Sequence, residues 1–309
     1  MAADPSPSGP MGSPSPGRLA QFACLLEVTA RKPGNVHRLR DFPDLHFVDF
    51  LLSAVTIAEP LDRASAVGVG VAVLQAIEAT RRVVRTNTNL GMVLLLAPLA
   101  AVPEGVEMAA GVETVLATTT VADARAVYRA IRLAEPGGLG STPDQDLAQE
   151  PTRTLRAVMN LAADRDLIAR QYANGFQEVL GEAVPALEVS LGVGRPLEAA
   201  IIAAHLSMLA RHPDSLIARK AGLDVAREVS RRAAEVLDAG WPDRPEARRL
   251  CDDFDAWLRE PGRRSNPGTT ADLVTAALYA ALRDGTIGIP LAQGFSFNEA
   301  SPKDGHGLE

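Results

Sequence analysis

The stretch RLAQFACLLEVTARKPG, residues 18–34, shows the pattern that decides the fold. Its apolar side chains recur at intervals of three or four, which places them on one face of an α-helix: Leu19, Phe22, Ala23, Leu26 and Ala30. Pro33 and Gly34 suit the two central positions of a tight turn. We therefore expect an amphipathic helix that ends just before this pair.

The same periodicity continues through the interior of the chain. It predicts helices over residues 47–58, 64–84, 90–101, 104–117, 122–134, 147–161, 162–180, 197–211, 224–239, 244–260 and 271–283. Residues 67–73 alternate as a strand does, but a lone strand has nothing to pair with. The expected fold is therefore all-α, a single-domain multi-helix bundle.

The ends of the 309-residue chain differ in composition from its interior. Residues 1–17 are mostly Pro, Ser and Gly, which predicts a disordered leader, and residues 291–309 predict a flexible tail. No long linker or fixed-period repeat interrupts residues 18–290, so we expect one all-helical catalytic domain there.

Composition excludes several classes of protein. The chain has 31 basic and 38 acidic residues, a net charge of −7, which offers no basic surface for nucleic acid. The longest apolar run is interrupted by Pro98 and is too short to span a bilayer. Cys24 and Cys251 stand alone, which fits a reducing compartment. We expect a cytoplasmic protein without membrane or nucleic-acid partners, and leave open whether it is a homo-oligomer.

Four polar loops carry more chemistry than their helices need. We name them by position: the first loop (27–38), the second loop (85–91), the third loop (212–222) and the fourth loop (263–272). The structural alternatives are an ordinary helix stop with a Glu27–Arg31 pair, a decorated helix cap in the second loop, and a short helix capped by Asp214. In the fourth loop, Thr269 and Asp272 have the spacing of a capping box.

Together the four loops favour an anionic ligand. Three of them directly precede helices, whose first N–H groups are free to bind anions. All four carry Lys or Arg on a chain that is acidic overall, which concentrates positive potential and suggests a polyphosphate. The chain has no GxxxxGK[ST] motif and no GxGxxG after a strand, so neither a P-loop nor a dinucleotide fold is indicated.

The ordered set of motifs resembles the triphosphoribosyl-dephospho-CoA synthase family, in particular its archaeal-type branch. The motifs are Lys-Pro-Gly (32–34), Thr-Asn-Thr-x-x-Gly (86–91), Asp-Ser-x-Ile-x-Arg-Lys-x-Gly (214–222) and Asn-Pro-Gly-x-x-Ala-Asp-Leu (266–273). Residues 128–140 and 162–172 are similar to that family as well. The resemblance covers roughly residues 20–290 and implies an all-helical fold.

The resemblance also implies a reaction and its cofactors. ATP donates its triphosphoribosyl group to 3'-dephospho-CoA, adenine leaves, and Mg²⁺ accompanies the triphosphate. Because displacement at a ribose carbon passes through a cation-like state, a nearby carboxylate stabilises it or activates the acceptor. The catalytic candidates are Glu27, Asp214 and Asp272. The binding candidates are Lys32, Gly34, Asn35, Thr86, Asn87, Thr88, Gly91, Ser215, Arg219, Lys220, Asn266 and Gly268. The metal ligands are left open.

Two departures from the family pattern leave the acceptor open. Residues 41–46 read Asp-Phe-Pro-Asp-Leu-His where many members carry Gly-Ala-His-x-Asp-Met, and Asn89-Leu90 stands where His-Lys is common. One alternative is a related ribosyl-phosphate transferase that acts on another cofactor precursor, as in a methanopterin-type one-carbon pathway. The other is a helical protein that binds nucleotides without turnover.

Overall fold

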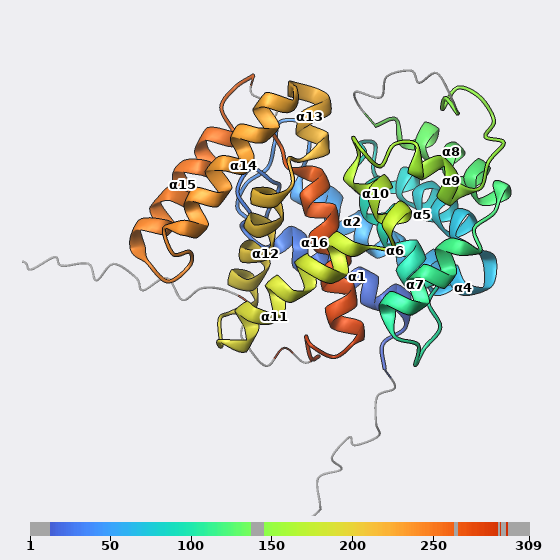
Figure 1. Ribbon diagram of the computed structural model, residues 1–309, viewed down its shortest axis with the longest axis horizontal. Helices are drawn as coiled ribbons and strands as arrows, with labels where there is room; N and C mark the ends of the chain where they lie inside the picture. Colours follow the sequence, from blue (N-terminus) through green and yellow to red (C-terminus); the bar gives the residue numbers. More distant parts are fainter. Residues whose placement is uncertain (1–12, 137–144, 263–264, 290, 292–294, 296–309) are drawn as a thin grey trace, which may run out of the picture.

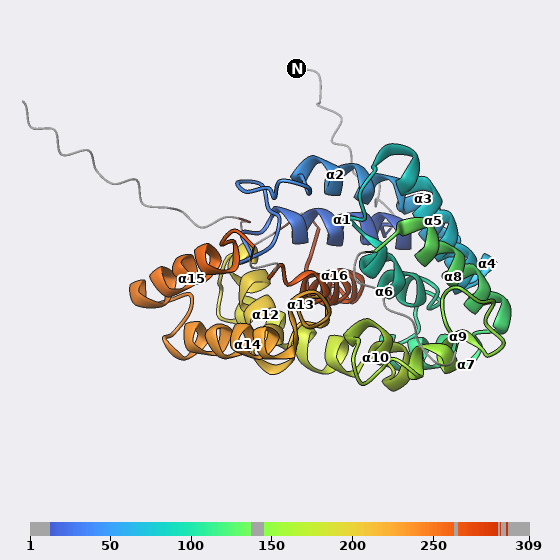
Figure 2. The ribbon, with the colours of Figure 1, turned by 90° about the horizontal axis from the view of Figure 1, so that it is seen from above.

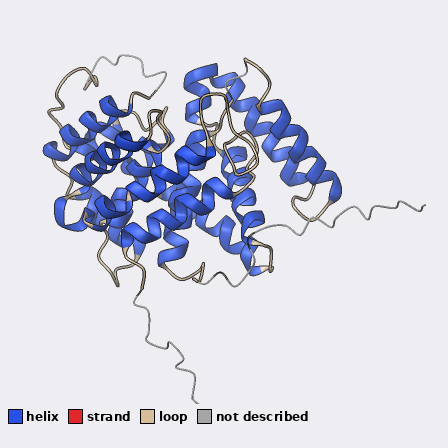
Figure 3. Ribbon diagram, turned by 180° about the vertical axis from the view of Figure 1, so that it is seen from behind, coloured by secondary structure: helices blue, strands red, loops and turns tan. Residues whose placement is uncertain are grey.

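A computed structural model of the protein describes residues 13–136, 145–262, 265–289, 291 and 295 (Figure 1). Within these ranges every regular element is a helix, apart from two isolated bridges, His37 with Arg40 and Phe42 with Leu45 (Figure 3). The all-α prediction is therefore confirmed.

The helices follow the chain in this order: α1 (Pro16–Thr29), α2 (Phe47–Thr56), α3 (Ala58–Asp62), α4 (Ala64–Val67), α5 (Val69–Val83), α6 (Leu90–Ala100), α7 (Met108–Ala117), α8 (Val121–Ala134), α9 (Leu155–Asn160), α10 (Leu167–Asn174), the π-helix η1 (Val179–Ala183), α11 (Val184–Gly192), α12 (Leu197–Arg211), α13 (Ser215–Ala221), α14 (Leu223–Asp238), α15 (Pro245–Leu258) and α16 (Gly268–Arg283).

Helix α16 runs through the middle of the molecule, with α1 beside it (Figures 1 and 2). From Thr269 to Leu282 almost every side chain is buried, because α16 is apolar or small on all sides. A helix of that composition can be stable only when other helices surround it. Its neighbours include α1, α6, α12 and α13, so four segments distant in sequence meet at this helix.

Two apolar cores share helix α12. Ile201, Ala204 and Met208 belong to the large core formed mainly with α1–α11 and α16. Ile202 and Leu206, on another face of α12, pack against α13, α14 and α15. Because one helix contributes to both cores, the α13–α15 layer is joined to the rest of the molecule through buried side chains. Figure 2 shows α12 beside α14.

Several helix ends follow local sequence signals. Thr120 and Asp123 form the predicted capping box at the start of α8. Gly240, with a φ of 94°, follows the C-cap of α14 as expected for a glycine in that position. Gly34 has a φ of 73° in the turn after α1, in line with the Pro33-Gly34 prediction.

Other predicted helices are divided or shorter. The range 47–58 ends earlier, as α2, and Pro60 lies inside the next helix, α3, at its third residue, where its missing N–H has no helical partner to lose. The range 64–84 is broken at Gly68, which adopts a φ of 87°, and Asp123 Oδ1 accepts a hydrogen bond from Gly70 N at the restarted helix. The range 147–161 keeps only α9, and 162–180 becomes α10 and the start of η1.

Candidate active site

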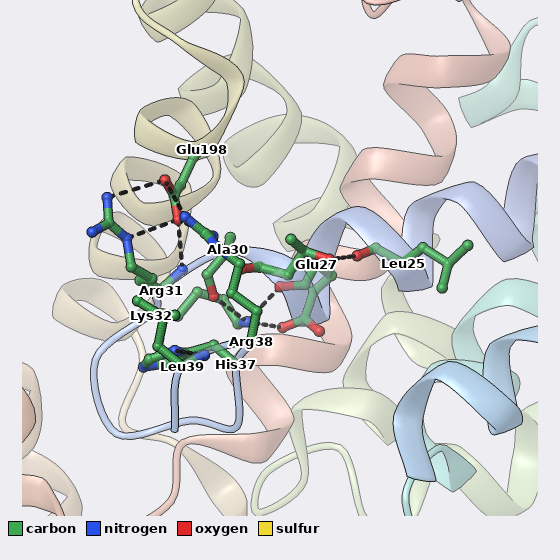
Figure 4. Close-up of polar contacts among 10 residues, drawn as sticks. Leu25, Glu27, Ala30, Arg31, Lys32, His37, Arg38, Leu39 and Glu198 are labelled. Atoms are coloured by element: carbon green, nitrogen blue, oxygen red, sulfur yellow. Dashed lines mark hydrogen bonds and ion pairs between the residues drawn. The ribbon is translucent and has the colours of Figure 1, made fainter. Parts of the chain in front are cut away.

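The turn after α1 is built around a buried ion pair. Lys32 Nζ lies 3.0 Å from Glu27 Oε1, and both side chains have no solvent exposure (Figure 4). The same ammonium donates to the backbone carbonyl oxygens of Glu27, at 2.5 Å, and Ala30, at 3.1 Å. All three ammonium hydrogens thus have acceptors within the protein. Lys32 therefore holds the turn in this structure and points away from solvent.

Burial acts on both members of this pair. It raises the pKa of Glu27, and the Lys32 cation opposes that shift. It lowers the pKa of Lys32, and the Glu27 carboxylate opposes it. Apart from the ion pair, the Glu27 carboxylate oxygens have no hydrogen-bond donor in the described part of the chain. The Glu27–Arg31 pair of the structural alternative does not form, because Glu27 binds Lys32 and Arg31 binds Glu198.

Arg31 and Arg38 instead bind a carboxylate that sequence reasoning missed. Glu198, buried in the first turn of α12, accepts hydrogen bonds from Arg31 Nε at 3.1 Å and Arg38 Nη1 at 2.5 Å (Figure 4). Although burial acts to raise it, the hydrogen bonds from the two arginines hold the pKa of Glu198 below its ordinary value. A glutamate in a first helical turn is common, so no local signal distinguished this one.

The first and fourth loops touch, although Asn35 and Asn266 are 231 positions apart: Asn35 Nδ2 donates to Asn266 Oδ1 at 2.9 Å. Gly34 is required for this approach, because a Cβ there would lie 2.5 Å from Leu258 Cδ1 and 3.1 Å from Pro267. Its backbone N–H also donates to Asp255 Oδ1 at 2.7 Å.

The third and fourth loops are joined through Asp214. Its Oδ1 accepts from the backbone N–H groups of Leu216 and Ile217, which confirms that it caps a short helix, α13. Its Oδ2 accepts from both the N–H and the hydroxyl of Thr270, at 2.7 and 2.8 Å. Burial raises the pKa of Asp214, against these hydrogen bonds. A carboxylate with four donors serves first to hold two helices together.

The predicted capping box of Thr269 and Asp272 is wrong. Helix α16 begins at Gly268, which puts both residues inside the helix, and its N-cap Pro267 makes no side-chain cap. Thr269 Oγ1 instead accepts from Ser215 Oγ at 3.1 Å. Gly268 also packs closely, since a Cβ there would lie 2.7 Å from Leu216 Cδ2. Contacts with the third loop thus replace the local cap.

Asp272 meets the second loop. A Cβ on Gly91 would lie 1.9 Å from Asp272 Oδ2, so only glycine leaves room for this carboxyl group. This close approach puts Asp272 at the N-terminus of α6, where the backbone amide of Met92 acts to lower its pKa. The residue as a whole is half-buried. Burial raises the pKa of its carboxyl well above the ordinary value, and Glu27, Asp214 and Asp166 add to the shift.

Most polar side chains of the second loop form hydrogen bonds with other groups of the protein. Asn87 Oδ1 accepts from Leu90 N, Thr88 Oγ1 lies 2.6 Å from Ser53 Oγ, and Asn89 Nδ2 donates to Thr80 Oγ1 at 2.9 Å. Thr86 Oγ1 is buried and has no hydrogen-bond partner in the described part of the protein. Thr86 is therefore the residue of this loop whose hydroxyl the described part of the protein leaves unsatisfied.

The cations of the third loop differ from Lys32. Arg219 Nη1 lies 3.7 Å from Asp166 Oδ2, and Lys220 is exposed without an ion pair to any described residue. Arg263 and Arg264, noted in the fourth loop, lie outside the described residues. Lys220 is thus the binding candidate with the most freedom to meet a phosphate.

The structure brings three loops together around α16 and joins the second loop to them through Gly91 and Asp272. It provides no contact that brings Asn87 or Lys220 to Lys32 or Asn266. A separate surface pocket of about 310 Å³ between α3 and α5, with Glu59, Arg63 and Glu78 among its lining residues, contains none of the candidates. Within the described ranges, no three acidic, His or Cys side chains are placed to hold a metal ion.

The sequence is also similar to those of known proteins. The sequence profile of the CitG family, described as ATP:dephospho-CoA triphosphoribosyl transferase, matches residues 13–289. The chain belongs to the CitG family. This is a family of transferases.

Two relatives of the CitG-family chain carry related names. A Pseudomonas syringae pv. tomato protein, a candidate 2-(5''-triphosphoribosyl)-3'-dephosphocoenzyme-A synthase, is 31% identical over 112 residues, which span 36% of this chain and 38% of that protein. The crystal structure of a candidate triphosphoribosyl-dephospho-CoA synthase from Archaeoglobus fulgidus superimposes with a TM-score of 0.59 at 25% identity, over 76% of this chain and 99% of that one. None of the helices described for the CitG-family chain is both long and apolar enough to cross a membrane.

Proposed function

We propose that the protein transfers the triphosphoribosyl group of ATP to 3'-dephospho-CoA with release of adenine. The bond from the ribose C1' to adenine breaks, and a ribose hydroxyl oxygen of dephospho-CoA bonds to that carbon. The proton of this hydroxyl passes to a carboxylate and leaves with adenine. Family membership and the convergence of four loops on the start of α16 support the proposal.

Asp272 is the carboxylate that we assign to the reacting carbon. Of the three catalytic candidates it is the one that is half-buried, whereas Glu27 and Asp214 have no solvent exposure. Its raised pKa makes it a stronger base toward the acceptor hydroxyl than an ordinary carboxylate. This position of Asp272 at the N-terminus of α6 is the observation that carries the proposal.

In this proposal, Glu27 and Asp214 support Asp272 from the interior of the protein. Both act on Asp272 electrostatically, and Asp214 also fixes the first turn of the helix that carries it. The binding candidates divide in the same way. Lys32, Gly34, Asn35, Ser215 and Gly268 shape the site by their packing and hydrogen bonds, whereas Thr86, Arg219, Lys220 and Asn266 keep solvent-accessible surface for the nucleotide.

The residues present fit Mg²⁺ as part of a Mg-ATP substrate. Magnesium in nucleotide sites takes one or two carboxylates, with phosphate oxygens and water completing its shell. With Asp272 assigned to the reacting carbon, the half-buried Asp166, which acts on Asp272 electrostatically, is the carboxylate that could hold it. The ion would neutralise the triphosphate where the chain supplies few free cations.

Adenine release from ATP, measured with and without dephospho-CoA, tests the function. Release that needs dephospho-CoA is the expected result, and Asp272→Asn should abolish it while ATP still binds. Release only with another acceptor would support the related ribosyl-phosphate transferase. Residues 41–46 are the reason for testing this alternative, because they depart from the family pattern. ATP binding without release under any condition would support a non-catalytic nucleotide-binding protein.

A further inference from the structure

Two buried hydroxyl groups outside the four loops face the second loop. Ser53 lies in α2 and Thr80 in α5, and both are almost completely buried. Ser53 Oγ lies 2.6 Å from Thr88 Oγ1, and Thr80 Oγ1 accepts from Asn89 Nδ2 at 2.9 Å. Neither residue belongs to a motif that indicated function from the sequence.

The direction of the Asn89–Thr80 hydrogen bond is fixed, because an amide nitrogen can only donate and Thr80 Oγ1 must accept. The hydrogen of Thr80 is left for the carbonyl of Ala76, at 3.0 Å, or for Thr56 Oγ1, at 3.3 Å. Ser53 Oγ lies 2.7 Å from the carbonyl of Asp49, and either hydroxyl of the Ser53–Thr88 pair can donate to the other. Thr80 is thus a fixed acceptor for the second loop, and Ser53 shares one hydrogen bond with it.

These contacts lead to the position of Asp272. Asn89 is the N-cap residue of α6, yet its side chain makes no cap and turns to Thr80 instead. Two residues further on, Gly91 lies so close to the Asp272 carboxyl group that a Cβ there would be 1.9 Å from Oδ2. A shift of Asn89 would thus move the first turn of α6 against the carboxyl group of Asp272.

We infer that Thr80 and Ser53 are positioning residues, which fix the second loop and thereby the start of α6 against which Asp272 is placed. This inference rests on the proposed function for its effect on turnover. The structural part stands separately, because it concerns the order of the second loop in the free protein.

Thr80→Val tests the inference, because it removes the acceptor and keeps the shape of the side chain. We expect amide hydrogen exchange over residues 90–93 to rise roughly tenfold, as the loss of about one buried hydrogen bond predicts. We expect kcat for adenine release to fall about tenfold through displacement of Asp272, with KM for ATP changed less. Thr80→Ser keeps the hydroxyl and should restore both values.

Thr275→Val is the matched control. Thr275 is equally buried and donates to the carbonyl of Ala271 at 3.0 Å, the same bond that Thr80 makes within its helix. Its hydroxyl has no second hydrogen bond to a described residue. Ser53→Ala, which removes the other hydroxyl with a smaller change, provides a second variant should Thr80→Val fold poorly; it should raise exchange over the same amides.

The outcomes separate the two proposals. Thr80→Val and Ser53→Ala that match Thr275→Val in exchange over residues 90–93 would overturn the inference. Raised exchange with unchanged kcat would overturn the link to Asp272. A wild-type protein that releases no adenine with dephospho-CoA would refute the proposed function instead, and the exchange comparison would still decide whether Thr80 and Ser53 order the loop.

Discussion

A single glycine determines where the carboxyl group of Asp272 lies. Gly91→Ala would place a Cβ 1.9 Å from Asp272 Oδ2, and the nearby Ile168 side chain leaves little room for the carboxyl to shift. Because a displacement of about 1 Å can reduce turnover a hundredfold, we expect kcat for adenine release to fall about a hundredfold.

A double-mutant cycle in the free energy of unfolding shows whether Gly91 acts through Asp272. Asp272→Ala removes the carboxyl group that the added Cβ would meet and leaves the end of the Ile168 side chain, 2.8 Å away, so Gly91→Ala should cost less stability in that background. Gly192→Ala, at the end of α11 where nothing lies within 4 Å, should behave the same in both backgrounds. Equal costs of Gly91→Ala in both backgrounds would mean that the contact with Asp272 does not decide the effect of the substitution.

Removing one partner of the buried Glu27–Lys32 pair should strongly lower the free energy of unfolding. Lys32→Met keeps the length of the side chain but leaves the Glu27 carboxylate without its counter-ion. Removing one partner of a buried pair costs about 3–5 kcal/mol in free energy of unfolding. Glu27→Gln with Lys32→Met removes both charges and should cost less than Lys32→Met alone. Urea unfolding at pH 7 measures both, and a double variant less stable than the single one would refute this account.

At the scale of helices, Asp214 joins two elements through four hydrogen bonds, whereas Asp166 caps α10 and meets α13 through an ion pair with Arg219 at 3.7 Å. Both use Oδ1 to accept two backbone N–H groups, Asp214 in α13 and Asp166 in α10. Asp214 Oδ2 has two further donors from Thr270 in α16. An asparagine keeps one oxygen, so Asp214→Asn would face Thr270 with an amide donor or leave α13 uncapped.

We therefore expect Asp214→Asn to lower the free energy of unfolding by about 3 kcal/mol and Asp166→Asn by about 1 kcal/mol. Chemical denaturation of the two variants under the same conditions makes the comparison. Similar losses for both would mean that the contact with Thr270 contributes little to stability.

Helices whose ends are set by neighbours in sequence were predictable. The stripe of α1, the apolar run of α6 and the capping box of α8 depend on residues at most four positions apart. The break at Gly68 was not predictable in this way, because its cause lies in α8, where Asp123 accepts from Gly70. Local spacing also misread Thr269 and Asp272, since their partners come from α13 and α6.

The same limit applies to the candidate site. Motifs of polar residues and glycines identified the four loops, but not which side chains face inward. The sequence suggested that Lys32 could bind a phosphate. In the structure its ammonium group is enclosed by Glu27 and by carbonyl groups of the turn. Glu198 and Thr80 carry no local signal at all, because each is an ordinary helical residue whose partners lie in another element.

At the scale of the whole molecule, stability should depend on a histidine in the helix shared by both cores. His205 in α12 is fully buried, and burial together with the Lys32 cation lowers its pKa to about 3, although the Pro33 carbonyl favours the protonated form. The ordinary value is 6.5, so between pH 6.5 and 3 the unfolded chain binds more protons than the folded one. The free energy of unfolding must therefore decrease as pH falls through this range.

A substitution separates His205 from His37, whose pKa burial and nearby cations lower to about 4. Between pH 7 and pH 5, His205 alone should remove about 2 kcal/mol from the free energy of unfolding. His205→Leu should weaken this dependence by about that amount and leave the part due to His37. Urea unfolding of both proteins at the two pH values tests it, and parallel losses would show that His205 accepts its proton equally in the folded and unfolded chain. Such a result would mean that the loss of stability in acid arises outside α12. It would also mean that the turn that contains Lys32 is not coupled to the two cores through His205.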